Sequence, residues 1–154
     1  MSAATVVIGL GNRFRHDDGI GPVIAELVGT HRMPGVTAVC VGDTDPTRLM
    51  EAWAGAGLAV VVDAARCRPP HPGRIHRLLP GSAVTGTAST HHFSVPDTLR
   101  LSAALGTSPG RLVVLAVEAG DLSPGIGLSP RVAEAVPRLL ARVLAEIRSA
   151  PGVA

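Results

Sequence analysis

The feature that most constrains the fold is a regular alternation of short apolar runs with segments of helical pattern. Five runs rich in Val, Ile, Leu and Ala have strand character, and they cover residues 5–10, 36–41, 58–62, 74–79 and 112–117. Segments with helical spacing lie between or after them, at 20–31, 46–56, 94–105 and 130–148. Strands that alternate with helices pair mainly in parallel. The sequence therefore predicts an α/β protein whose sheet contains many parallel strands and has helices on both faces.

Length and composition exclude several classes of function. The 154 residues suit one domain, so residues 1–154 are treated as a single unit. All 14 basic residues are Arg, which excludes a Schiff-base lysine and a phosphate-loop lysine. The chain has a small net charge of +2, and its Arg residues are scattered along the sequence. Aromatic residues make up only 2% of the chain. These properties argue against a nucleic-acid partner.

The chain carries no pattern that indicates a membrane or an oxidising compartment. Its first residues lack a basic segment ahead of an apolar one, and the longest apolar runs are too short to cross a bilayer. Cys40 and Cys67 are far apart and form no C-x-x-C pair, so we expect two buried, unbridged thiols. The expectation is a cytoplasmic protein with no membrane partner.

Residues 8–21, IGLGNRFRHDDGIG, join the first predicted strand to the first predicted helix. Two adjacent carboxylates, Asp17 and Asp18, are costly to bury unless a cation or a proton compensates them, which points to a metal. An N-terminal helix cap is a second interpretation, but capping accounts for only one of the two. A dinucleotide-binding turn is a third; it is disfavoured because Phe14 replaces the last glycine of that fingerprint.

Further ligand-type residues follow other strands. Asp63 comes directly after 58–62, and Glu118 follows the last strand and can lie on the same edge. His91 directly precedes a predicted helix. Asp18, Asp63 and His91 would give an oxygen, oxygen and nitrogen set, which suits a divalent transition metal and leaves coordination positions open. Helix capping for Asp63 and a surface or capping role for His91 or His92 remain alternatives. The other histidines lie in loops or at edges without a spaced partner: His16, His31, His71 and His76.

Four motifs occur in a fixed order: G-x-G-N-x4-D-D-G-x-G at 9–21, V-V-D-A at 61–64, S-T-H at 89–91 and G-x-G-L-S-P at 125–130. In this order they resemble the nickel–iron hydrogenase maturation endopeptidases, over about 6–144. The resemblance implies a single three-layer α/β/α domain with a mixed, mostly parallel five-stranded sheet. It also implies an endopeptidase that removes the C-terminal extension from the nickel-loaded precursor of a hydrogenase large subunit.

The resemblance assigns Asp18, Asp63 and His91 as metal-contacting and catalytic residues. The nickel would be supplied by the precursor, so the resting enzyme can be metal-free, and either carboxylate is a candidate general base. The motif alignment favours His91 over His92. Many relatives have Asp-Gly-Gly-Thr after the second strand, whereas here Val41-Gly42-Asp43-Thr44 leaves an acidic role there lost or taken by Asp43. A non-catalytic metal-binding chaperone for a metalloenzyme precursor is the alternative function.

Overall fold

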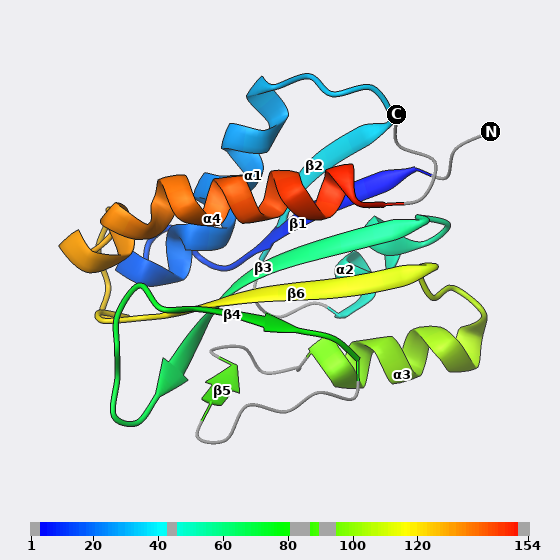
Figure 1. Cartoon of the computed structure of the whole chain (residues 1–154). Helices are drawn as coiled ribbons and strands as arrows, with labels where there is room; N and C mark the ends of the chain where they lie inside the picture. Colours follow the sequence, from blue (N-terminus) through cyan, green and yellow to red (C-terminus); the bar gives the residue numbers. More distant parts are fainter. Residues whose placement is uncertain (1–3, 43–45, 81–86, 90–94, 151–154) are drawn as a thin grey trace.

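The computed structural model describes residues 4–42, 46–80, 87–89 and 95–150. Its sheet follows a path of five strands (Figure 1), in the order β2 (Val36–Val41), β1 (Thr5–Leu10), β3 (Leu58–Cys67), β6 (Arg111–Glu118) and β4 (Ile75–Leu78). The first four are parallel and β4 is antiparallel at the edge. A short strand off this path, β5 (Thr87–Ser89), pairs antiparallel with the end of β3. The predicted mixed, mostly parallel sheet is confirmed.

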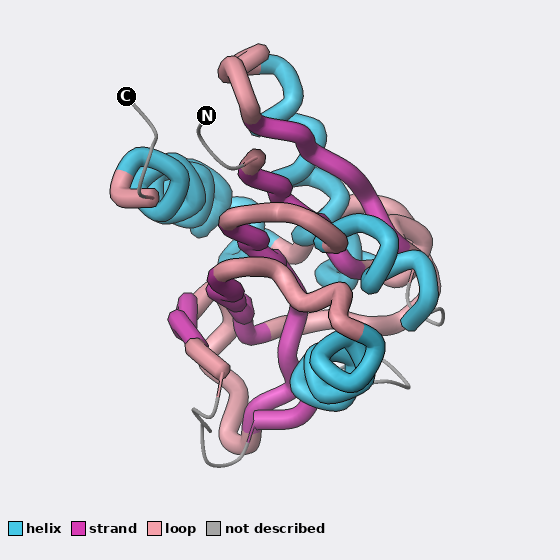
Figure 2. Tube along the Cα trace, turned by 90° about the vertical axis from the view of Figure 1, so that its right-hand side faces the viewer, coloured by secondary structure: helices cyan, strands magenta, loops and turns pink. Residues whose placement is uncertain are grey.

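Helices cover both faces of this sheet. The α1 (Ile20–Thr30) and α4 (Pro130–Arg148) helices contact each other on one face, whereas α2 (Pro46–Trp53) and α3 (Val95–Leu105) contact each other on the other. Figure 1 shows α1 and α4 on the near side of the strands, and Figure 2 shows the strands between the two helical layers. The three-layer α/β/α arrangement follows because strands buried on both faces need a helical cover on each.

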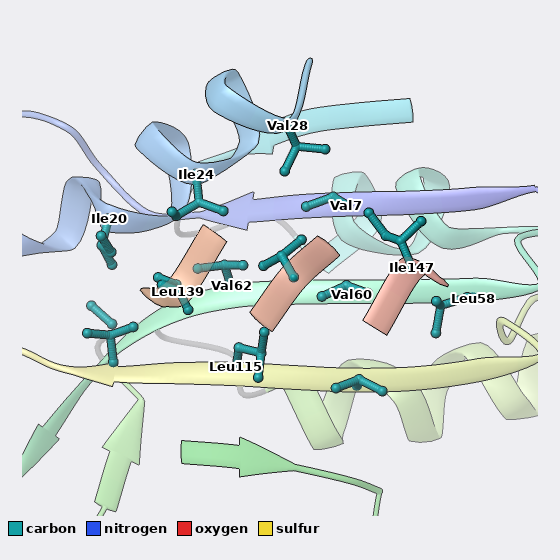
Figure 3. Packing of buried hydrophobic residues seen from close by; sticks show 14 of the residues in the cluster. Val7, Ile20, Ile24, Val28, Leu58, Val60, Val62, Leu115, Leu139 and Ile147 are labelled. Atoms are coloured by element: carbon teal, nitrogen blue, oxygen red, sulfur yellow. The ribbon is translucent and has the colours of Figure 1, made fainter. Parts of the chain in front are cut away.

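The side chains of β3 divide the core between the two faces. Val60 and Val62 are fully buried under α1 and α4, in a cluster that includes Ile24, Leu139 and Ile147 (Figure 3). The alternate residues of β3, Ala59 and Val61, face the α2–α3 layer. There Trp53 is fully buried and its indole N–H donates to Ser102 Oγ at 2.9 Å. Odd-numbered residues of β3 therefore face α2 and α3.

The strand β3 is longer than the sequence pattern predicts. It continues from Val62 to Cys67, because β6 pairs with it as far as Ala65 and β5 pairs with its last three residues. Asp63, expected just after the strand, is inside it. The continuous apolar run ends at Val62, but β3 keeps its hydrogen-bonding partners beyond that residue. Boundaries judged from apolar residues alone are therefore too short here.

The two cysteines are unbridged, as expected, but they are not buried. Cys40 is exposed, and Cys67 is partly buried. The expectation of buried thiols is wrong for Cys40 because β2 is an edge strand of the sheet, paired on one side only with β1. An apolar neighbourhood in sequence does not reveal which strand lies at an edge.

The helix α4 begins as the sequence predicts. Pro130 is its first residue, as expected, and the helix runs through Pro137 to Arg148. Ser129 occupies the N-cap position, but its hydroxyl makes no capping hydrogen bond and donates to Asp17 Oδ2 instead. The buried side chains of α4 recur on one side, at Val132, Leu139 and Val143 among others. Within the described parts of the chain, no helix is both long enough and apolar enough to cross a bilayer.

Candidate active site beside the carboxyl end of β1

Glycines hold the segment after β1 tightly against the sheet. A Cβ on Gly9 would lie 2.1 Å from the carbonyl oxygen of Gly21, and a Cβ on Gly21 would lie 2.2 Å from that of Leu10 and 2.7 Å from that of Val62. No side chain can replace hydrogen at such approaches. The start of α1 therefore packs directly against the carboxyl end of β1 and the middle of β3. The turn that precedes α1 is held at the same place.

Asp18 lies in that turn and is fully buried. It belongs to the 3-10 helix η1 (His16–Gly19), and its Oδ2 accepts a hydrogen bond from the backbone N–H of Asn12 at 2.8 Å. It does not cap α1, whose N-cap is Gly19. A Cβ on Gly11 would lie 3.4 Å from Asp18 Cγ, so the glycine leaves the room that the carboxylate occupies. The capping interpretation of Asp18 is therefore wrong.

Asp63 lies at the point where the pairing of β3 with β1 ends. The pairing of β1 with β3 ends at Gly9 and Val62, and Asp63 is the next residue, opposite Ala116 of β6. Its exposed fraction is only 5%. The η1 turn that carries Asp18 contacts β3. The structure thus brings Asp18 and Asp63, two buried carboxylates from different segments, to the same edge of the sheet.

His91 and His92, together with Asp43, lie outside the described residues. The chain just before them is described: Ser89 pairs with Ala65, which is two residues past Asp63 on β3. The antiparallel register of β5 runs toward Asp63 as residue numbers rise from 87 to 89. This pairing returns the chain to the Asp63 end of β3.

Asp17 has a structural role that the sequence did not reveal. It is fully buried, and its carboxylate accepts hydrogen bonds from four donors in the 120–129 loop, at 2.7–2.8 Å: the backbone N–H groups of Gly120, Asp121 and Ser129, and the hydroxyl of Ser129. Donors of this number can stabilise a buried anion without a cation. Asp17 therefore needs no metal to be buried, contrary to the expectation for the adjacent pair.

Glu118 ends β6 and is almost completely buried, at 2% exposed. Its Oε2 lies 2.8 Å from His76 Nε2, and its Oε1 accepts from the backbone N–H of His71 at 2.9 Å. Burial by itself raises the pKa of Glu118, but the hydrogen bonds from His76, from the backbone of His71 and from Cys67 outweigh burial and lower the pKa below its ordinary value. His76 has no partner at a recognisable spacing in the sequence, because the antiparallel pairing of β4 with β6 brings it to a residue 42 positions away.

Comparisons with known proteins agree with this fold. A family model described as hydrogenase maturation protease matches residues 22–146, a range that includes Asp63 and His91 and begins just after Asp18. The hydrogenase 2 maturation protease of Escherichia coli strain K12 is 28% identical over 147 residues, which cover 93% of this chain and 90% of that protein.

Solved structures give the same result. The hydrogenase maturating endopeptidase HybD from E. coli superposes with a TM-score of 0.81 and 26% identity, over 96% of this chain and 94% of that chain. A NiFe hydrogenase maturation protease, HybD from Thermococcus kodakarensis, shares the fold with a TM-score of 0.75 at 20% identity, over 94% of this chain and 98% of that chain. This chain therefore belongs to the hydrogenase maturation protease family.

Proposed function

We propose that the protein is an endopeptidase that removes the C-terminal extension from the nickel-loaded precursor of a nickel–iron hydrogenase large subunit. In this proposal the nickel arrives as part of the substrate. Asp18, Asp63 and His91 contact it, so that a precursor without nickel offers these side chains nothing to bind. Family membership supports the protease activity.

The observation that carries the proposal is the convergence of Asp18 and Asp63 at one edge of the sheet. Both are buried, at 0% and 5% exposed, and they come from segments separated by the whole of α1, β2 and α2. Buried carboxylates that face one region repel each other unless a proton or a cation is shared between them. Carboxylate oxygens with an imidazole nitrogen form a suitable partial ligand set for a divalent transition metal that brings its remaining ligands from the precursor.

The pairing of β5 supports a nitrogen ligand from the segment that follows it, and the motif order favours His91. Ser89 is held beside Ala65, so the sequence Ser89-Thr90-His91 starts from a fixed point two residues past Asp63 on β3. His92 follows directly and is the competing ligand. Single substitutions of the two histidines therefore decide which one contributes.

The chain's own residues supply two chemical functions in this proposal. One carboxylate, Asp18 or Asp63, accepts a proton from the attacking water as a general base. The other, with His91, orients the nickel-bearing end of the precursor so that the scissile peptide lies beside that water. The same residues would thereby recognise a loaded precursor and cut it.

The deciding experiment incubates the purified protein with precursor that either contains or lacks nickel, and follows the mass of the precursor. Cleavage is expected only with nickel. Asp18→Asn, Asp63→Asn and His91→Ala should each block cleavage, whereas Glu134→Gln, which changes an exposed carboxylate on α4, should leave it unchanged. His92→Ala should retain activity. Equal cleavage with and without nickel would refute nickel recognition.

The same assay separates the alternative functions. A non-catalytic chaperone would bind the loaded precursor and leave its mass unchanged. A nucleotide-binding protein would gain thermal stability from adenine nucleotides. The position of residues 18–21 argues against a bound pyrophosphate, because the buried carboxylate of Asp18 already occupies the space beside Gly11.

A further inference from the structure

A group of metal-ligand side chains lies farther along the sheet from Asp63. One ligand atom from each of Cys67, His76 and Glu118 can be chosen such that all three lie within 4.8 Å of one another. The three residues come from the strands β3, β4 and β6. Glu118 is level with Ala65 of β3, and His76 is level with Ala116 of β6. Because side chains alternate along a strand, all three project to the α2–α3 side of the sheet.

The donor set has the composition of a transition-metal site. A thiolate, an imidazole and a carboxylate are all common ligands of Zn²⁺, which binds sulfur at about 2.3 Å and nitrogen or oxygen at about 2.0–2.2 Å. Ligand atoms in such a tetrahedron lie about 3.3–3.8 Å apart, so small rotations of these side chains would close the site. The charge also balances, because one thiolate and one carboxylate neutralise a divalent ion. A neutral site is suited to a group as buried as Glu118.

The carboxylate at the centre of the group is already oriented. Glu118 Oε1 is held by the backbone N–H of His71, and Oε2 faces His76 Nε2. The ring of His71 lies at the rim, half exposed, with Nδ1 at 3.9 Å from Oε1, where a fourth ligand is needed. Arg74 Nε lies 3.9 Å from Oε2, but its side chain is 58% exposed and can turn into solvent when a cation enters.

We propose that Cys67, His76 and Glu118 form a second metal site, for a divalent ion of the zinc class, with His71 or a water at the fourth position. Binding releases the thiol proton of Cys67 to solvent, and His76 presents an unprotonated ring nitrogen. The bound ion would link β3, β4 and β6 at the end of the sheet. Ligation by His71 would also order the 68–74 loop. The proposal does not depend on the proposed function, since it shares no residue with Asp18, Asp63 and His91.

The test uses Co²⁺ as a spectroscopic probe and Zn²⁺ as the competitor, with the full-length protein freed of metal by a chelator. Addition of Co²⁺ should produce a sulfur-to-cobalt charge-transfer band that saturates at about one ion per chain and is abolished by Zn²⁺. This band identifies the new site, because the Asp18, Asp63 and His91 set contains no sulfur. Calorimetric titration with Zn²⁺ then gives the affinity of each variant.

The variants have a matched control in the second cysteine. Cys67→Ser should remove the charge-transfer band, and His76→Gln and Glu118→Gln should weaken Zn²⁺ binding at least about 10-fold. Cys40→Ser, on the exposed edge strand β2, should leave both unchanged. Asp63→Asn should also leave the band unchanged, which keeps this result separate from any failure of the nickel proposal.

The proposal is overturned if cobalt gives no thiolate band, or if the band survives in Cys67→Ser. Should that variant fail to fold, the Cys40→Ser protein provides a second measurement: Zn²⁺ should slow the alkylation of its remaining thiol by iodoacetamide. An alkylation rate that is independent of Zn²⁺ contradicts the site.

Discussion

Asp17 and Asp18 follow one another in the chain and are both fully buried, but they face two different regions of the molecule. Asp17 faces the 120–129 loop and accepts four hydrogen bonds from it. Asp18 accepts a hydrogen bond from the backbone N–H of Asn12, just past the end of β1, and the turn that carries it contacts β3. The comparison teaches that burial of a carboxylate does not by itself indicate function. Two equally buried neighbours are hydrogen-bonded to different segments, so the partners of each carboxylate must be considered separately.

The largest expected effect tests the turn that holds both carboxylates. Gly11→Ala should destabilise the protein by more than about 4 kcal/mol, or prevent folding, because strain and overpacking of this degree are at the severe end of single substitutions. The new Cβ would lie 1.9 Å from the carbonyl oxygen of Asp18, at a φ of +137°. Chemical denaturation measures the loss.

Gly35→Ala is the matched control for that substitution. Gly35 also has a positive φ, +73°, but no atom lies within 4 Å of its Cβ position. The Gly35→Ala substitution should therefore lower the free energy of unfolding by only about 1–2 kcal/mol, the cost of the backbone strain alone. Equal losses for the two variants would show that close packing against Asp18 does not matter.

The second prediction concerns Asp18 alone. Asp18→Asn should lower the cleavage rate about 10²–10⁴-fold, the range that a positioned acid–base group contributes. Its melting temperature should change little, since the remaining side-chain oxygen still accepts from Asn12 N–H and a buried charge is removed. Precursor cleavage and thermal unfolding are measured on the same preparation. Full activity of Asp18→Asn would show that Asp18, like Asp17, has only a structural role.

The third prediction is the reverse pattern for Asp17. Asp17→Asn should destabilise the protein by about 3 kcal/mol. The amide NH2 of Asn would face N–H groups that now donate hydrogen bonds to the carboxylate, so those groups would lose their acceptor. For a domain of this size that corresponds to a fall in Tm of about 6–12 °C. Below the unfolding temperature, cleavage should be close to that of the unchanged protein. A loss of activity with an unchanged Tm would contradict the division between the two residues.

The smallest expected effect sharpens the comparison with Glu118, a third buried carboxylate. Its lowered pKa means that its ionisation stabilises the fold above the unfolded-state pKa of about 4.3, and that this stability is lost as the pH falls through the folded value. In chelator-treated protein, Glu118→Gln should lower the Tm by about 2–4 °C near neutral pH, since one hydrogen bond to a charged group is weakened.

The difference between the two proteins should then shrink as the pH falls below about 4.3 and through the lowered pKa of Glu118, because the protonated carboxyl is uncharged like the amide of Gln. The groups around Glu118 are His71, Arg74, His76 and Cys67, and none is altered in this variant. Melting curves across pH measure the gap. A constant gap from neutral to acid pH would show that the ionisation of Glu118 does not stabilise the fold.

The alternation of strands and helices, the mostly parallel sheet and the start of α4 at Pro130 could all be predicted from the sequence. Those features depend on local patterns: apolar β-branched runs, helical periodicity, and the cap and first-turn preferences of single residues. The family resemblance also came from sequence, because its motifs are contiguous. Asp18 and Asp63 could be proposed as candidates from local signals too, because Asp18 lies in the first motif and Asp63 directly follows the apolar run 58–62.

The partners that compensate each buried charge could not be predicted, because they come together only in the folded chain. The donors to Asp17 lie more than one hundred residues away, and the pairing of Glu118 with His76 exists because β4 returns antiparallel to β6. The continuation of β3 to Cys67 likewise depends on partners that the apolar pattern does not show. Hydrogen bonds between distant segments leave no pattern in a sequence. The burial of one face of a helix or strand does leave a periodic pattern, and helix propensity can be judged from residue types.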